Sequence, residues 1–411
     1  MKQPDPVVVI GAGLVGLASA RAFARANPRF PVIVLEKESA VASHQSGHNS
    51  GVLHAGLYYR PGSAKARLAV QGIRAMVEYC ADRGIPYERC GKLVVSVDES
   101  EVPRLRALLD RGTANGLTGL RWLSPSEARE REPEVDCTAA LHVPEEGIVD
   151  FPAVARSLAR DIAALGGEVR IDTALSAVHP DGKAWRLETN RGDVRAQFVV
   201  NCAGLHADRV ANWLKAPDVP PIIPFRGDYY KLRHDREHLV RHLIYPVPDP
   251  AFPFLGVHFT RLIGGGVECG PSAVLALKRE GYGRTDVDAR DALSSMSYPG
   301  MWRFLGRHPA MVAAELWRTA SRKAFTRRLQ RLLPALEASD LVPGGSGVRA
   351  QAITRDGRLV EDFLFREGPA SLHVLNAPSP AATASLAIGD VVARRAIASI
   401  NGTSVSLKGV S

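Results

Sequence analysis

The chain has 411 residues, 45% of them hydrophobic and 23% charged, which is enough for two packed globular domains. No apolar run has the length of a transmembrane helix, and glycines interrupt the apolar start of the chain where a signal peptide would be continuous. The five cysteines form no C-x-x-C pair, so we expect free thiols in the cytoplasm and no metal site. The formal charge of +9 predicts anionic partners.

A dinucleotide-binding unit opens the chain. Residues 7 to 10, VVVI, predict a buried parallel strand, and residues 32 to 35 predict a second strand that ends at Glu36. Between them stand three glycines in the spacing G-x-G-x-x-G, namely Gly11, Gly13 and Gly16. Such glycines permit a tight turn and let the backbone approach a pyrophosphate, while the acid accepts hydrogen bonds from ribose hydroxyls. This unit predicts binding of adenosine diphosphate as part of a dinucleotide.

Further along the chain, helical and strand patterns alternate. A helix is predicted over 64–84, a strand and a helix over 91–116, and a helix that ends at Gly166 and Gly167. The buried strand in FVVNCAG, residues 198 to 204, ends in Ala203 and Gly204, whose small size allows a ligand to approach. Aromatic residues, prolines and glycines over 221–300 predict an antiparallel sheet with long loops, and a strand (371–377) and a helix (381–398) follow. The order predicts two domains, each built from discontinuous segments.

A basic segment stands apart. Residues 317 to 333 contain six arginines and lysines and no acid, and Phe325, Leu329 and Leu332 or Leu333 fall on one helical face. One interpretation is a solvated helix packed on its own domain; the other is a peripheral contact with anionic membrane lipid. Nucleic acid is not expected, because no nucleic-acid fold or aromatic-interleaved basic stripe is present.

Long stretches of the sequence resemble a known family. The chain is similar to the FAD-dependent flavoproteins of the D-amino-acid-oxidase type. Within that superfamily it resembles the L-2-hydroxyglutarate oxidases and dehydrogenases. The narrower resemblance rests on four stretches: GHNSGVLHAGLYYRPGSAKARL, FLGVHFT, GPSAVLALKREGY and LNAPSPAATASLAIG.

The resemblance implies an α/β fold, with a Rossmann-like FAD-binding domain (1–90, 146–220 and 335–411) and a mostly antiparallel substrate domain (91–145 and 221–334). FAD is the implied cofactor. The loop after Glu36 would run along it, with Gly47 among its contacts and His54, Ala55 and Gly56 against the flavin ring. A helix start in the C-terminal stretch would place amides and a helix dipole near the reduced flavin. The implied cofactor contacts are Gly11, Gly13, Gly16, Glu36, Lys37, Asn49, Ser50, Gly51, Ala203, Gly204, Ser379, Pro380, Ala381, Ala382 and Thr383.

The resemblance also implies substrate contacts. Arg349, in GGSGVRAQAITRDG, matches the superfamily arginine that grips a substrate carboxylate, although Ala350 replaces the usual following proline. His54 and His258 are the candidate bases, because the ordinary pKa of histidine lies near neutral pH. Either could instead be a core histidine bonded to the backbone. A second anion contact could come from Arg226, Tyr245, Thr260 or Arg261, and Arg60 and Lys65 are further candidates.

The expected reaction is oxidation of L-2-hydroxyglutarate, a small dicarboxylate, to 2-oxoglutarate. Two alternatives stay open: a related flavoenzyme that oxidises an amine or amino acid, and a dinucleotide-binding protein without catalysis. Oxygen, a quinone and other electron carriers all suit a reduced flavin, and no motif chooses among them.

Overall fold

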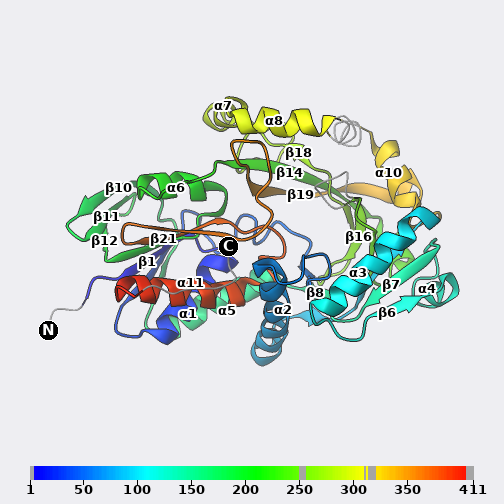
Figure 1. Cartoon of the computed structure of the whole chain (residues 1–411), viewed down its shortest axis with the longest axis horizontal. Helices are drawn as coiled ribbons and strands as arrows, with labels where there is room; N and C mark the ends of the chain where they lie inside the picture. The colour runs from blue at the N-terminus through cyan, green and yellow to red at the C-terminus, as the bar shows by residue number, and fades with distance from the viewer. Residues whose placement is uncertain (1–3, 250–255, 310–311, 313–320, 404–411) are drawn as a thin grey trace.

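The computed structural model describes residues 4–249, 256–309, 312 and 321–403. A six-stranded sheet occupies one half of the molecule (Figure 1). Its strands are parallel except at the β20–β21 edge. In spatial order they are β20 (Leu364–Gly368), β21 (Ser371–Asn376), β13 (Phe198–Asn201), β1 (Val7–Ile10), β2 (Val32–Leu35) and β9 (Glu168–Arg170).

Both faces of this sheet are covered, which explains the run of β-branched residues in β1. Val7 and Val9 belong to a core cluster with α1 (Leu14–Ala26), α5 (Phe151–Ala164) and α11 (Ser385–Ile400), which lie together below the sheet in Figure 1. Val8 and Ile10 point the other way, into a cluster with Trp185.

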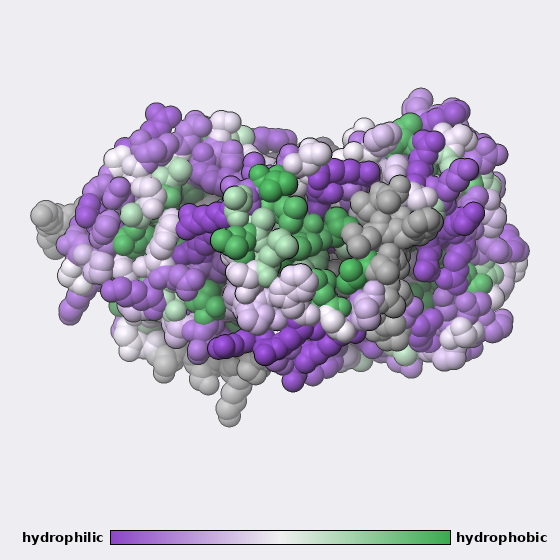
Figure 2. All heavy atoms as spheres, turned by 90° about the horizontal axis from the view of Figure 1, so that it is seen from above, coloured by the Kyte–Doolittle hydropathy of each residue, from purple (hydrophilic) through white to green (hydrophobic). Residues whose placement is uncertain are grey.

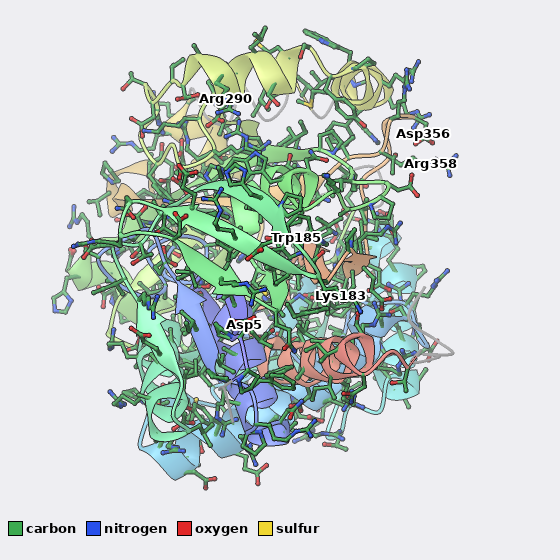
Figure 3. The ribbon with its side chains drawn as sticks, turned by 90° about the vertical axis from the view of Figure 1, so that its left-hand side faces the viewer. Asp5, Lys183, Trp185, Arg290, Asp356 and Arg358 are labelled. Atoms are coloured by element: carbon green, nitrogen blue, oxygen red, sulfur yellow. The ribbon has the colours of Figure 1, made fainter. Side chains whose placement is uncertain are left out.

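A small antiparallel sheet covers that second face. It consists of β10 (Leu175–Asp181), β11 (Ala184–Thr189) and β12 (Val194–Ala196). Trp185 anchors it, because its ring is buried and its Nε1–H donates to the Pro369 carbonyl at 2.9 Å (Figure 3). Nearby, α6 (Ala207–Trp213) follows β13.

The other half of the molecule contains a nine-stranded sheet. All its pairings are antiparallel except that of β5 with β15. The helices α3 (Val102–Ala114), α4 (Pro125–Arg131) and α10 (Arg322–Gln330) belong to this half. The strand order is β18 (Val274–Leu275), β14 (Ile222–Leu232), β17 (Val267–Gly270), β16 (His258–Arg261), β15 (Leu243–Pro246), β5 (Lys92–Ser96), β7 (Ala139–Val143) and β6 (Arg121–Leu123), with β19 (Leu341–Ala352) paired to β14. The predicted fold class, a Rossmann-like domain with a mostly antiparallel second domain, is confirmed.

Three short strands lie where the two halves meet. β3 (Val52–Leu53) pairs with β8 (Gly147–Val149), which also pairs with β4 (Tyr87–Glu88). At Gly51, just before β3, φ is +69° and an added Cβ would lie 2.8 Å from the Val149 carbonyl oxygen. Only glycine fits there, so Gly51 positions the strand and α2 (Ala64–Arg83) follows it.

The predicted strands over 7–10 and 32–35 are confirmed, as is the helix from residue 64, which ends at Gly84 with φ +62°. Two elements differ. The helix expected from residue 381 begins at Ser385, because Thr383 is held in the preceding turn: its hydroxyl accepts the His54 N–H and donates to the Val52 carbonyl. Within the region predicted as sheet and loops, α7 (Ala289–Met296) is helical, and α8 (Pro299–Arg307) continues past it.

The strand β19 lies in the nine-stranded sheet, although its residues were assigned to the FAD-binding domain. We therefore propose that the last domain boundary falls near residue 353 and not at 335. For the basic segment, residues 317–320 lie outside the described residues. The described helix α10 buries Phe325 and Leu329, each at most 1% exposed, in the core of its own domain. Among the described helices, none is long and apolar enough to cross a membrane.

Candidate active site

A cavity of about 1140 Å³ joins the two halves of the molecule. At one end it is lined by the glycine turn and Glu36, and at the other by His54, His258 and Arg349. One continuous space therefore connects the predicted nucleotide end to the predicted reacting end.

The glycine turn is forced by backbone contacts. Gly11 has φ +99°, and an added Cβ would lie 2.6 Å from the Cys202 carbonyl oxygen; a Cβ on Gly16 would lie 2.0 Å from the Gly11 carbonyl oxygen. Gly13 caps α1 and lines the cavity. Because α1 starts at the cavity wall, its first amides and its dipole favour a phosphate there.

Glu36 closes the same turn. Its carboxylate accepts the backbone N–H of Ala12 at 2.8 Å and that of Glu38 at 3.0 Å, and the residue lines the cavity. Each carboxylate oxygen keeps lone pairs beyond these bonds, so the side chain can also accept from ribose hydroxyls.

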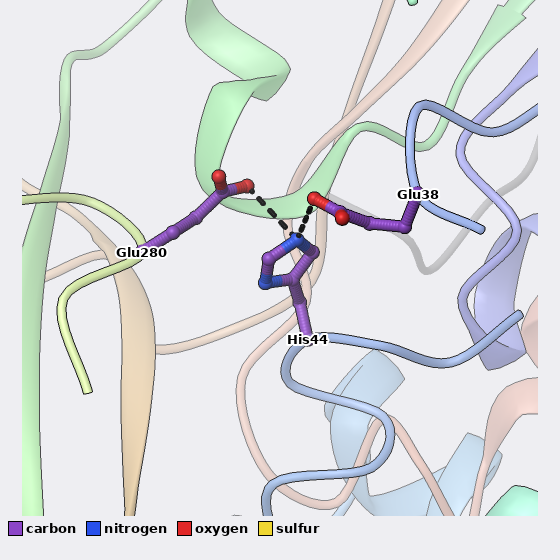
Figure 4. A group of neighbouring side chains, drawn as sticks. All are labelled: Glu38, His44 and Glu280. Carbon is purple, nitrogen blue, oxygen red and sulfur yellow. Dashed lines mark hydrogen bonds and ion pairs between the residues drawn. The ribbon is translucent and has the colours of Figure 1, made fainter. Parts of the chain in front are cut away.

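Beside Glu36, a charged cluster links the two domains (Figure 4). His44 Nε2 lies 2.9 Å from a Glu38 oxygen and 3.3 Å from a Glu280 oxygen. The Lys37 ammonium contacts Glu38 and lies 3.0 Å from Glu280, which places a positive charge among these carboxylates. Glu38, His44 and Glu280 could together ligate a metal ion, but the Lys37 ammonium already contacts both carboxylates. Lys37 lines the cavity, and its ammonium group points to Glu38 and Glu280.

The other predicted cofactor contacts also line the cavity, except Gly47, Gly51, Ala55 and Gly56. Asn49 stabilises its own loop, donating to the Gln45 and Ser46 carbonyls. The Ser50 hydroxyl donates to Glu268 at 2.8 Å. The lining includes Ala203, Gly204, Ser379, Pro380, Ala381, Ala382 and Thr383.

At the opposite end, Tyr245 is the centre of the site. It is 2% exposed and lines the cavity. The His258 ring stacks on it with centroids 3.9 Å apart, and the His54 ring meets it edge-on at 6.5 Å. Two histidines from different sheets therefore share one aromatic support.

His258 has a defined tautomer. Its Nδ1 lies 2.8 Å from the Gly256 carbonyl oxygen, so Nδ1 carries the proton. In the described part of the chain no group hydrogen-bonds Nε2, which is left as an acceptor. Burial, helped by nearby Lys92, His54 and Arg349 and opposed by the Gly256 contact, lowers the pKa of His258 to about 3. The ring is therefore neutral at physiological pH.

His54 lies beside a buried ion pair. Lys92 and Glu146 contact each other, and both side chains are 0% exposed. His54 Nδ1 is 3.4 Å from the Lys92 ammonium nitrogen and 3.7 Å from the Glu146 carboxylate. Burial lowers the pKa of His54, and Lys92 lowers it further while Glu146 opposes the shift.

Not every predicted substrate contact reaches the cavity. Arg349 and Tyr245 line it, whereas Arg226, Thr260 and Arg261 do not. Arg226 donates to Asp228 at 2.9 Å and also to the Gly283 carbonyl. Arg226 and Asp228 share one face of β14, because side chains alternate along a strand.

Three lining tyrosines, Tyr58, Tyr59 and Tyr229, were not predicted as site residues, and neither was the Lys92–Glu146 pair. Tyr229 belongs to the same stretch, FRGDYY, from which Arg226 was predicted as a substrate contact. A lysine at the start of the apolar run KLVVS was the only sequence signal for Lys92.

Comparison with known proteins identifies the family. The model of the family described as "FAD dependent oxidoreductase" matches residues 6–395. The chain belongs to this family of FAD-dependent oxidoreductases. The L-2-hydroxyglutarate dehydrogenase of Indibacter alkaliphilus is 47% identical, over 95% of this chain and 98% of that protein. The human mitochondrial L-2-hydroxyglutarate dehydrogenase is 43% identical, over 94% of this chain and 87% of that protein.

A solved structure supports the fold. The L-α-glycerophosphate oxidase of Mycoplasma pneumoniae with FAD bound has a TM-score of 0.78 at 21% identity, covering 98% of this chain and 97% of that one. FAD is the cofactor of this family, and the cavity suits it: the glycine turn, the start of α1 and Glu36 lie at one end and the histidines at the other. The glycine turn and Glu36 would hold the adenosine diphosphate portion.

We predict that Gly13→Val lowers FAD content. An added Cβ would lie 3.0 Å from Ser46 Oγ, which accepts the Leu14 N–H at 2.9 Å. A branched side chain would therefore fill the turn and disturb this hydrogen bond. The measurement is the ratio of flavin to protein absorbance after purification. Gly306→Val is the matched control, because nothing lies within 4 Å of its added Cβ. Full, tightly held FAD in Gly13→Val would contradict the assignment.

Proposed function

We propose that the protein oxidises L-2-hydroxyglutarate to 2-oxoglutarate, with FAD as the electron acceptor. The observation that carries the proposal is His258, a neutral ring whose free Nε2 lies in the same cavity as Arg349. A hydroxyacid requires these two functions, a base for the hydroxyl proton and a cation for the carboxylate. The names of the relatives at 47% and 43% identity support this substrate.

Each residue has a separate role in this proposal. The planar guanidinium of Arg349 binds the carboxylate next to the reacting carbon, which orients that carbon. His258 Nε2 accepts the hydroxyl proton, since Nδ1 is committed to the Gly256 carbonyl. The glycine turn and Glu36 would hold FAD, which would supply the acceptor for the hydride of that carbon. Loss of the hydride and of the hydroxyl proton converts the carbinol to a ketone.

Lys65 is the proposed contact for the second carboxylate. It lines the cavity close enough to His54 to lower the pKa of that histidine. Burial lowers the pKa of Lys65 itself to about 8, so it is still mostly protonated at neutral pH. Arg60 lines the same region but is exposed, which makes its charge less effective.

Oxidation of an amine is the less supported alternative. Glycine oxidase from Geobacillus kaustophilus has a TM-score of 0.72 but only 19% identity, which shows a shared fold and nothing more. The relatives named above are called dehydrogenases, which favours an electron carrier over oxygen as the final acceptor.

Anaerobic L-2-hydroxyglutarate should bleach the flavin absorbance of the purified protein, and two variants should slow this in different ways. His258→Ala should lower kcat by roughly 100 to 10,000-fold, as expected for a lost base. Arg349→Lys keeps the charge without the bidentate fork, so kcat/KM should fall by roughly 10 to 100-fold, with KM raised. Stopped-flow reduction measures both effects. The proposal is wrong if wild-type flavin stays oxidised or if both variants react at the wild-type rate.

For Lys65 the expected result is a change in specificity. Lys65→Met should raise KM for L-2-hydroxyglutarate roughly tenfold, because a charged hydrogen bond to the distal carboxylate is lost. The weak reaction with L-2-hydroxybutyrate, which lacks that carboxylate, should stay unchanged. Parallel steady-state assays measure the two ratios. An equal loss with both substrates would place the second carboxylate elsewhere.

We also propose a peripheral contact with anionic membrane, through α7 and α8 rather than through the basic segment. The apolar face of α10 is buried in its own domain, so that helix can offer only charge. Figure 2 looks down on α7 and α8 and shows hydrophobic residues gathered within a hydrophilic rim. Val287, Leu293 and Trp302 are 61%, 69% and 57% exposed. Exposed arginines at 290, 303 and 307 on the same two helices favour anionic lipid.

Sedimentation with anionic vesicles at low salt tests this contact. Leu293→Ser/Trp302→Ser should move the protein from the pellet to the supernatant, because the inserted apolar area is lost. Arg327→Gln/Arg328→Gln on α10 is the control with charge alone removed, and should change pelleting less. If wild type stays in the supernatant, there is no such contact; if only the arginine variant is released, α10 makes it.

A further inference from the structure

The buried pair Lys92–Glu146 lies outside the substrate and cofactor contacts described above, and yet it touches both halves of the reacting end. Lys92 begins β5 and Glu146 precedes β8. The Gly91 N–H donates to the Glu146 carbonyl at 2.9 Å, which brings the two side chains together. Burying two charges costs several kcal/mol per ion before pairing. Because burying the Lys92–Glu146 ion pair is costly, we looked for a role of this pair in the neighbouring active site.

The backbone register brings this pair to His54. Leu53 lies opposite Gly147 in the antiparallel β3–β8 pair, so the next residues outward, His54 and Glu146, face each other. A Glu146 oxygen also accepts the Ala55 N–H at 3.2 Å. Of the two charges, the Lys92 ammonium is the nearer to His54 Nδ1, at 3.4 Å against 3.7 Å for the carboxylate. An ammonium can only donate, so Nδ1 is the acceptor and the ring proton is on Nε2.

The same ammonium acts on His258 through Tyr245. Lys92 Nζ lies 4.0 Å from the Tyr245 ring centroid, and His258 stacks on that ring at 3.9 Å. Two groups this close to one ring must occupy opposite faces. The Tyr245 ring is therefore held between an ammonium and an imidazole, and the ammonium disfavours a positive charge on the imidazole.

We propose that Lys92, held by Glu146, is a positioning residue that keeps both histidines neutral and fixes them in opposite tautomers. His54 presents Nε2–H as a hydrogen-bond donor to the substrate, and His258 presents a bare Nε2 as the base. The roles assigned to substrate rest on the proposed function, whereas the tautomers do not. The proposal also decides between the two candidate bases that the sequence left open.

The charges around both rings agree with this assignment. Burial is the main cause that lowers the pKa of each histidine, and Lys92 lowers both. Burial would raise the pKa of Glu146, but the charge of the Lys92 ammonium lowers it, so the carboxylate stays charged. Among the described residues, Lys65, Arg349 and Tyr245 also act on or contact the two rings, and Tyr58 lies against the Lys92 ammonium.

The test uses the FAD-loaded protein and the variant Lys92→Met/Glu146→Gln, which removes both charges and leaves no buried ion alone. Nitrogen-15 NMR of histidine-labelled protein, without substrate, should show the Nε2–H form of His54 in wild type and its loss in the variant. The acid limb of kcat/KM should move to higher pH by roughly one unit or more. The sign follows from the base: it works unprotonated, so a raised pKa removes activity at a higher pH.

A second buried ion pair supplies the matched control. Arg279 and Asp208 contact each other at 2% and 5% exposure, away from the two histidines. Arg279→Met/Asp208→Asn should lower stability while leaving the His54 signal and the acid limb in place. An Nδ1–H form of His54 in wild type would overturn the proposal, as would an unmoved acid limb in Lys92→Met/Glu146→Gln. A wild type that shows the predicted tautomers but does not oxidise L-2-hydroxyglutarate would refute the proposed function and leave the histidine assignment intact.

Discussion

The site depends on neutralising one carboxylate. Glu146 is completely buried, and an isolated charge there would be too costly to keep. Its oxygens meet the Lys92 ammonium, the Ala55 amide and the edge of His54. These partners come from two separate stretches of chain, the loop with His54 and Ala55 and the start of β5 with Lys92. Satisfying one buried ion therefore fixes how the histidine loop sits against the nine-stranded sheet.

The second half of the site follows from the same arrangement. Once Lys92 is fixed, the Tyr245 ring lies over its ammonium, and His258 stacks on the far face of that ring. The loop carrying His54 is fixed from the other side by Thr383, whose hydroxyl accepts the His54 N–H at 3.1 Å. The reacting end is thus built from both domains, with buried polar contacts in place of flexible surface side chains.

What the sequence could predict was local. The strand, glycine turn and second strand are set by neighbouring residues, so their bounds were correct to the residue. Arg349 was found through resemblance, and the cavity lining includes it. The face that a strand side chain takes depends on the partner sheet, and the Arg226 guanidinium is bound to Asp228, outside the cavity lining. The Lys92–Glu146 pair could not be predicted, because residues 54 apart meet only through strand pairing that no local pattern specifies.

The cluster around Glu280 bears on how the cofactor leaves. Glu280 and Tyr282 come from the loop after β18, yet they bind Lys37 and His44 at the nucleotide end of the cavity, with the Tyr282 ring 4.0 Å from that of His48. This loop reaches from one domain to Lys37 and His44 of the other, and its Glu280 lines the cavity. Escape of the nucleotide by that route requires breaking these bonds first. If the nucleotide leaves by that route, the rate of flavin loss on dilution or dialysis would depend on how often these interdomain contacts open.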